Sequence, residues 1–150
     1  MVLTINKFMG EYRWLSNFHM VNVEFEGRVY PSTEHAYQAA KSPSEEIREM
    51  FSTKIETPGK AKKASLALEC PPGWHDSRKF EVMEQVLREK FLKNDDLKTK
   101  LLDTHPQDLI EGNTWHDNCW GSCVCTKCGN SGQNNLGKIL MKIREDVKGK

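Results

Sequence analysis

VNVEFEGRVYPSTEHAYQAAK, the run from Val21 to Lys41, contains the sequence patterns of both β-strands and an α-helix. Its first five residues alternate apolar and polar side chains, which is the period-2 pattern of a half-buried strand. Glu26 and Gly27 then offer a turn into a second short strand. Residues 31–33 end the strands and can cap a helix over residues 34–41, so the run predicts a strand hairpin followed by a helix.

Upstream of this run we expect strands throughout the first 30 residues, and downstream we expect mostly helices. Capping signals, Pro and Gly stops, and apolar residues spaced three and four apart locate these helices. They are expected after Ser42 through Phe51, from Thr57 to about Glu69, from Asp76 or Ser77 through Phe91, around Leu97–Leu102 and from near Asn134 to Val147, with a short strand at 108–111. Helices outnumber strands and do not alternate regularly with them, which predicts an α+β fold.

The length and charge of the chain limit its class. At 150 residues without a linker or repeat, it is expected to form a single compact, helix-rich domain over residues 1–150 with a small β-sheet. The net charge is +1, from 22 Lys and Arg and 21 Asp and Glu, so charge alone does not mark a duplex-DNA binder. A mean hydropathy of -0.67 without a long apolar run excludes a transmembrane helix.

The start of the chain bears on its location. Residues 1–8 lack the basic flank and the long apolar stretch of a signal peptide. We therefore expect a cytoplasmic protein with no membrane partner and no obligate protein partner.

The predicted helix at residues 34–41 carries the first candidate site. Glu34, Tyr37 or Gln38, and Lys41 share one of its faces. A carboxylate with a neighbouring amide and amine suits acid–base chemistry or the binding of sugar hydroxyls. An acid in the first helical turn is also stabilised by the helix dipole without any function.

Two further groups lie at expected element boundaries. Arg13 could pair with a phosphate and Asn17 could bind a hydroxyl or a base edge, although a turn capped by Ser16 and Asn17 is the favoured alternative. Trp74, just before a helix, could stack on a planar base or pack in the core.

The last third of the chain holds another carboxylate and another helix start. Asp117 stands between aromatic residues, including Trp120, where its charge would matter for catalysis, but Asp117 and Asn118 also form a common turn pair. The turn that opens the last helix has backbone N–H groups that could cradle a phosphate, with Gly137 permitting close approach. Helix capping explains the same turn equally well.

Four of the five cysteines are crowded into ten residues, which favours reduced thiols over a disulfide framework. Cys123, Cys125 and Cys128 could supply three thiolates to zinc, with Cys119 or His116 as the fourth ligand. The pattern lacks the second, separated cysteine pair of common zinc ribbons. Free thiols in a loop are therefore the favoured interpretation.

Taken in order, these groups resemble the NADAR family of YbiA-like proteins along nearly the whole chain. The resemblance lies in Leu15–Phe18, Tyr30–Lys41, Trp74, Val82–Met83, Lys90–Phe91, Asp117, Trp120–Gly121, Gly132–Met141 and Ile143–Arg144. It implies a helix-rich α+β fold and an N-glycosidase, a hydrolase acting on N-glycosyl bonds. Some members hydrolyse phosphoribosylated intermediates of riboflavin biosynthesis, and others remove ADP-ribose from modified guanine in nucleic acid.

The resemblance also implies roles for the candidate residues. It places Glu34 and Asp117 in the active site, one activating water or anchoring a hydroxyl and the other stabilising an oxocarbenium ion, in either order. Trp74 is then expected to stack on the leaving base. The expected substrate-binding residues are Arg13, Ser16, Asn17, Gln38, Lys41, Trp120, Asn134 and Gly137. This chemistry needs no metal and no organic cofactor.

The expected substrate is a ribosylated small molecule or an ADP-ribosylated nucleic acid. Two other classes remain open: a non-catalytic ADP-ribose-binding module, and a zinc-containing interaction domain built on the cysteines. The presence of both Glu34 and Asp117 favours the enzyme.

Overall fold

The computed structural model describes residues 3–149, so the part of the predicted strand region at Met1 and Val2 lies outside the described residues. The chain divides into two compact units. The central unit comprises Asn17–Lys93, and the terminal unit comprises the residues up to Ser16 together with those from Asn94 onward. The prediction of a single domain spans both units and stays a prediction. Within the described range, no helix is both long and apolar enough to cross a membrane.

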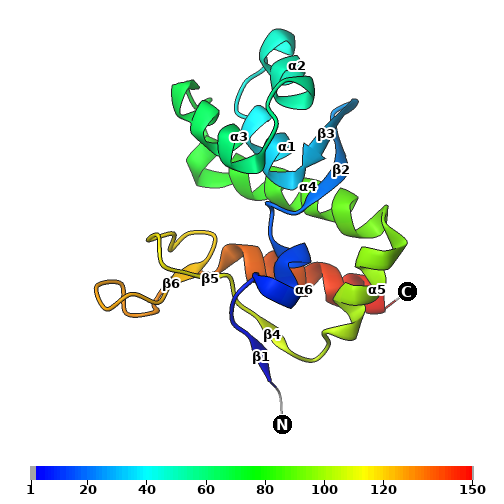
Figure 1. The fold of residues 1–150 in the computed structure, drawn as a ribbon, viewed down its shortest axis with the longest axis vertical. Helices are drawn as coiled ribbons and strands as arrows, with labels where there is room; N and C mark the ends of the chain where they lie inside the picture. Colours follow the sequence, from blue (N-terminus) through cyan, green and yellow to red (C-terminus); the bar gives the residue numbers. More distant parts are fainter. Residues whose placement is uncertain (1–2, 150) are drawn as a thin grey trace. The chain divides into compact units, whose positions relative to one another are not determined.

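The central unit is a two-stranded hairpin followed by helices. Its elements are β2 (Met20–Phe25), β3 (Arg28–Ser32), α1 (Thr33–Ala39), α2 (Glu45–Thr53), α3 (Pro58–Ala64), η2 (Ser65–Ala67), η3 (Trp74–Arg78) and α4 (Lys79–Leu92). The hairpin and α1 both pack against α4 (Figure 1). Each helix predicted for this region is present, but the longest one begins later than expected because the π-helical turn η3 precedes it.

The hairpin forms as its sequence predicts. Glu26 and Gly27 join the antiparallel strands with φ angles of 48° and 84°, the left-handed conformation that two-residue hairpin turns favour. Val23, Phe25 and Tyr30 are buried, whereas the residues between them are exposed or partly exposed. The hairpin therefore presents one apolar face to the core of the central unit.

Helix α1 lies at the centre of this unit. Every residue from Thr33 to Ala39 is buried, because the helix contacts the hairpin, α2, α3 and α4. Ala36 and Ala39 are fully covered, and their small side chains permit such close packing. Polar side chains on α1 are consequently held in a desolvated environment.

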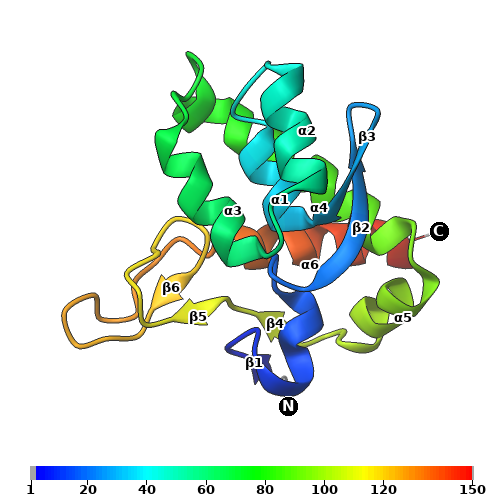
Figure 2. The ribbon, with the colours of Figure 1, turned by 45° about the horizontal axis from the view of Figure 1, so that its top comes forward.

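The described residues of the terminal unit form short strands, one 3-10 helix and two α-helices. Its elements are β1 (Thr4–Ile5), η1 (Gly10–Leu15), α5 (Asp95–Asp103), β4 (Asp108–Leu109), β5 (Gly112–Asn113), β6 (Ser122–Cys123) and α6 (Asn135–Lys148). β1 pairs with β4 and β5 pairs with β6, both in parallel. Helix α6 packs against β4 and α5 (Figure 2), with Leu136, Leu140 and Ile143 buried.

The prediction of strands throughout the first 30 residues is wrong for Gly10–Leu15, which form the 3-10 helix η1. Trp14 and Leu15 are adjacent and both buried, which a strand of alternating faces does not allow. The α+β prediction is confirmed, since in residues 3–149 helices predominate and the strands form three separate two-stranded sheets.

Lys90 is fully buried on the apolar stripe of α4, three residues after Leu87. Its ammonium group lies 5.0 Å from the centre of the Phe91 ring. Burial lowers the pKa of Lys90 to about 7. The folded chain therefore binds fewer protons at this site than the unfolded chain between about pH 7 and about pH 10.4.

We predict that the free energy of unfolding rises with pH across this window, because the unfolded state carries the extra proton. Lys90→Met removes the titrating group and should flatten the pH dependence. Lys93→Met, which alters an exposed lysine just past the same helix, is the matched control and should keep it. Urea unfolding over this pH range measures the slope, and an unchanged slope in Lys90→Met would contradict the assignment.

Candidate functional site

Glu34 and Gln38 form a buried polar pair on α1. They are only 7% and 5% exposed, and Gln38 Nε2 donates a hydrogen bond of 2.6 Å to Glu34 Oε2. The backbone N–H of Glu34 donates to the carbonyl oxygen of Asn17. Glu34 stands in the first turn of α1, where the helix dipole favours its negative charge. The structure thus places this carboxylate in a fixed and largely desolvated position.

The start of α1 is fixed by Ser32 and His35, which flank Glu34 in the sequence. Ser32 Oγ accepts the backbone N–H of His35 and lies 2.6 Å from His35 Nδ1. Since His35 Nε2 lies 2.9 Å from the carbonyl oxygen of Ile55, Nε2 carries the proton and Nδ1 accepts from Ser32. Burial lowers the pKa of His35, although the bond to Ile55 opposes this effect. A neutral His35 therefore locks the turn that carries Glu34.

Lys41, Tyr37 and Trp74 lie around the same helix. Lys41 Nζ lies 5.7 Å from the centre of the Tyr37 ring, and the Tyr37 and Trp74 rings are 5.5 Å apart and tilted by 45°. Burial lowers the pKa of Lys41, while interactions with Cys70 and Glu34 oppose this shift. The structure thus brings Glu34, Gln38, Lys41 and Trp74 onto or against α1.

Two buried polar atoms of this group lack hydrogen-bond partners among the described residues. They are Gln38 Oε1, an acceptor, and Trp74 Nε1, a donor. Such an unpaired atom costs about 1–3 kcal/mol, which a ligand that pairs with it would recover. Trp74 is only 1% exposed, which favours the core position over open stacking.

Asn17 is buried beside α1 and holds it in place. Its side-chain oxygen accepts a bond of 3.1 Å from Thr33 Oγ1, and its Nδ2 lies 3.4 Å from Met83 Sδ. These contacts account for Asn17 as a positioning residue. A contact between Asn17 and a sugar hydroxyl stays a prediction.

In the terminal unit, the carboxylate of Asp117 closes a turn. Its Oδ1 accepts from the backbone N–H groups of Cys119 and Trp120, at 3.1 and 2.9 Å. No described residue donates a hydrogen bond to the other oxygen, Oδ2. Both interpretations of Asp117 therefore remain compatible: one oxygen builds the turn, and the other can act on a ligand.

Asn113 is the residue that the sequence analysis missed. It is 3% exposed, its Oδ1 accepts from the N–H of Asp117, and its Nδ2 donates to the carbonyl oxygen of Asp117. It holds the Asp117 backbone from four residues away.

The backbone N–H groups at the start of α6 are hydrogen-bonded within the chain. The backbone N–H groups of Asn134, Asn135 and Leu136 donate to the carbonyl oxygens of residues 119–121. The Asn134 side chain accepts from Glu111 and donates to the carbonyl oxygen of Leu109. These bonds favour the capping interpretation, and phosphate binding here stays a prediction.

The remaining predicted residues of the terminal unit lie near its surface. Arg13 is exposed on η1, and the Ser16 backbone N–H donates to the Arg13 carbonyl oxygen at the end of that helix. Trp120 is partly exposed. Their contacts with a substrate stay predictions.

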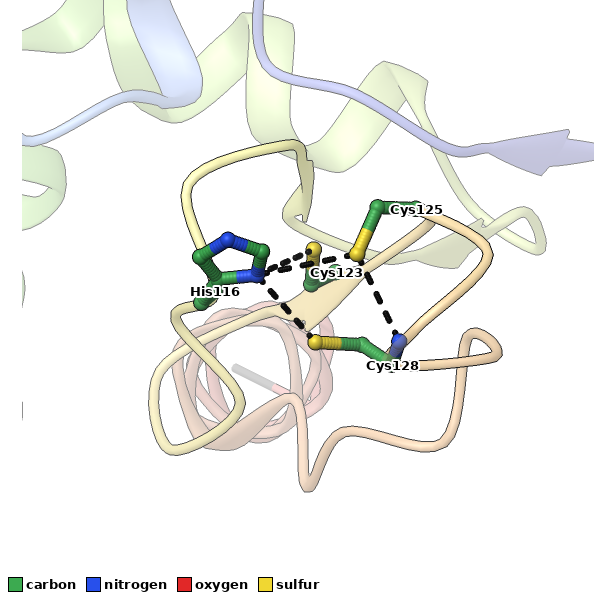
Figure 3. Close-up of side chains that lie close together, drawn as sticks. All are labelled: His116, Cys123, Cys125 and Cys128. Carbon is green, nitrogen blue, oxygen red and sulfur yellow. Dashed lines mark hydrogen bonds between the residues drawn. The ribbon is translucent and has the colours of Figure 1, made fainter.

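The described residues contain one group of side chains with metal-ligating atoms that converge. His116, Cys123, Cys125 and Cys128 have their ligand atoms within 4.8 Å of one another (Figure 3). Of the two candidates for the fourth ligand, the structure selects His116, because Cys119 lies outside this group.

Known proteins resemble this chain over nearly its full length. Residues 6–148 match the NADAR domain. N-glycosidase YbiA of Escherichia coli (strain K12) is 33% identical over 139 residues, which cover 91% of this chain and 82% of that protein. A riboflavin biosynthesis protein of Vibrio vulnificus (strain YJ016) is 34% identical over 138 residues, 89% of this chain and 35% of that protein.

The fold agrees with a solved structure. The NMR structure of the E. coli protein YbiA matches with a TM-score of 0.81 and 29% identity, over 99% of this chain and 85% of that chain. The chain belongs to the NADAR family, which confirms the resemblance drawn from its motifs.

Gly137 lies where α6 packs against β4. A Cβ atom built on it would lie 2.0 Å from the carbonyl oxygen of Leu109, so the residue permits α6 to approach β4. We predict that Gly137→Ala lowers the free energy of unfolding by about 1–3 kcal/mol through overpacking. Gly59→Ala, in α3 with no atom within 4 Å of the new Cβ, should instead stabilise by about 0.4–1 kcal/mol. Urea unfolding of both variants measures the opposite signs, and a harmless Gly137→Ala would contradict the packing role.

Proposed function

We propose that this chain is an N-glycosidase that hydrolyses the N-glycosidic bond of a phosphoribosylated intermediate of riboflavin biosynthesis. Support for the reaction comes from relatives that are named N-glycosidases, in E. coli and in Nostoc punctiforme. Support for the substrate class comes from the V. vulnificus relative, which is named a riboflavin biosynthesis protein.

The observation that carries the proposal is the buried Glu34–Gln38 pair. Gln38 fixes one carboxylate oxygen through Nε2 and leaves its own Oε1 without a partner among the described residues. A ribose hydroxyl that donates to Gln38 Oε1 would satisfy this atom and bring the sugar beside Glu34. The same carboxylate can then accept a proton from a water molecule or from a second hydroxyl.

Hydrolysis of an N-glycoside passes through an oxocarbenium-like transition state. The bond between the anomeric carbon and the base nitrogen breaks, its electron pair leaves with the base, and a water oxygen bonds to the anomeric carbon. Glu34 takes one proton of that water in our assignment. The nitrogen of the leaving base, which keeps the bonding electron pair, takes a proton from the protonated Glu34 or from solvent water, so that the reaction consumes one water molecule. A buried carboxylate suits this task because water does not screen its charge.

Asp117 is assigned the stabilisation of positive charge on the sugar. Its Oδ1 is held by two backbone N–H groups, which fixes the carboxylate in direction, while Oδ2 is left for the ligand. The roles of Glu34 and Asp117 can be exchanged, since both are carboxylates. The phosphate is assigned to Lys41 and Arg13, the two cations among the candidate residues.

An ADP-ribosylated substrate shares the ribose, the base and the phosphate, and is the alternative. Incubating the protein with both substrate types, with detection of the released base and sugar phosphate by mass spectrometry, distinguishes them. Release from the phosphoribosylated intermediate is the expected result. Release only from ADP-ribosylated guanine would replace the substrate class, and release from neither would contradict the proposal.

Glu34→Gln keeps the size of the side chain and removes its basic oxygen. We predict that kcat falls by about 10²–10⁴-fold, the usual contribution of a general base. Glu46→Gln, in the first turn of α2 and exposed, is the matched control and should retain the parental kcat. Thermal melting of both variants checks that the fold survives. A Glu34→Gln protein that turns over at the parental rate would remove Glu34 from the reaction.

Trp74→Phe deletes the unpaired Nε1–H while keeping an aromatic ring in the core. If the leaving base accepts a hydrogen bond from this donor, the variant should bind a non-hydrolysable substrate analogue about 5–150-fold more weakly, which corresponds to about 1–3 kcal/mol. Tyr30→Phe is the matched control, because it deletes the other buried unpaired donor of the central unit, and it should bind normally. Calorimetric titration measures both affinities. Equal affinities would leave Trp74 as a core residue only.

A further inference from the structure

The loop that joins β5 to β6, strand β6 itself and the turn after it bring four side chains to one point. Figure 3 shows the His116 ring and the sulfur atoms of Cys123, Cys125 and Cys128 directed toward one another. These residues are separated by up to twelve positions in the sequence, and His116 precedes β6 whereas Cys125 and Cys128 follow it. Such convergence is unusual for cysteines that serve only as loop residues.

The distances in this group match those of a tetrahedral metal site. His116 Nδ1 lies 3.3 Å from Cys128 Sγ, 3.6 Å from Cys125 Sγ and 3.7 Å from Cys123 Sγ. Zinc bonds of about 2.3 Å to sulfur and about 2.0–2.1 Å to nitrogen place a sulfur and a nitrogen ligand about 3.5–3.6 Å apart. The space enclosed by the four atoms is therefore the size that one zinc ion requires.

Backbone hydrogen bonds hold the three cysteines in this arrangement. The N–H of Cys128 donates to Cys125 Sγ at 3.4 Å, as expected beside a thiolate ligand. The N–H of Asn130 donates to the carbonyl oxygen of Cys123, and that of Gly129 to the carbonyl oxygen of Cys125. These bonds curl the chain so that Cys128 returns to Cys123.

This turn has little hydrophobic reason to keep its shape. In the range 124–131 none of the side chains is buried, and Val124 is 55% exposed. His116 additionally adopts a φ of 68°, the left-handed region that a residue with a Cβ atom seldom occupies. A metal bound by the four side chains would stabilise this turn, as it does in small domains that lack a core.

We propose that His116, Cys123, Cys125 and Cys128 bind one structural zinc ion. All four coordination positions come from the protein, so the site is closed, which is the pattern of a structural and not a catalytic zinc. Three thiolates and one imidazole favour zinc over the hard cations that prefer oxygen. The ion joins β6 and the following turn to the residue just before Asp117. Zinc binding replaces the interpretation of these cysteines as free thiols, and it does not depend on the proposed hydrolase activity.

The test measures metal content in the full chain purified without chelators from zinc-supplemented cells. We expect about one zinc per chain, and we expect Cys125→Ser and Cys128→Ser to weaken zinc binding by more than about 100-fold, since even outer partners of a zinc site contribute about 10–100-fold. Cys119→Ser is the matched control: it changes a neighbouring thiol whose Sγ lies near Asn135 Nδ2, and it should keep its zinc. Equal loss of zinc from Cys119→Ser and Cys125→Ser would overturn the ligand assignment.

A second measurement remains decisive if the cysteine variants fail to fold. Replacing zinc by cobalt in the parental protein should give the intense visible bands of a tetrahedral site and the charge-transfer absorption of cobalt–thiolate bonds. Removing the metal with a chelator should lower the temperature of unfolding. A parental chain that takes up neither metal, that contains iron instead, or that loses two hydrogens in mass through a disulfide among these cysteines would overturn the proposal.

Discussion

The hydrogen bonds of Ser32 determine how the central unit is built. Its hydroxyl accepts the N–H of His35 and donates to the His35 ring, whose other nitrogen reaches Ile55. One side chain therefore ends β3, begins α1 and ties that helix to the segment ahead of α3. Because α1 is buried on all sides, its direction fixes what packs around it. This cap and the burial of α1 together fix the position of the Glu34 side chain.

Local patterns predicted the regular parts of the fold well. The period-2 pattern and the Glu26–Gly27 turn gave the hairpin, and capping residues with apolar stripes gave the helices, including α6, within a few residues. The 3-10 helix η1 and the π-turn η3 were missed, since short helices of unusual period leave no repeat to detect. β4 lies within the short strand predicted at 108–111, but the pairing of the two-residue strands was beyond reach. The partners of β1 are far away in sequence, and all of these strands are too short to show alternation.

The candidate site, like the fold, was predictable only where local sequence patterns determine it. Glu34, Gln38 and Lys41 follow from helical spacing, and the structure places all three on or beside α1. The contacts that decide between a structural and a chemical role are long-range: Thr33 and Met83 on Asn17, Leu109 against Gly137, and the carbonyl groups that occupy the start of α6. Lys90 falls on the apolar stripe of α4 that includes Leu87, which is consistent with its burial. A lysine in such a position is ordinarily interpreted as the edge of the apolar stripe, so its burial was not predicted.

The division of the terminal unit between the two ends of the chain sets the order in which the protein can fold during synthesis. Asn17–Lys93 is continuous, so the central unit has all of its residues once Lys93 has left the ribosome. Thr4 and Ile5 are made before the central unit, yet their partners in β4 are Asp108 and Leu109, respectively. Strand β1 therefore stays without its partner while the whole central unit is translated.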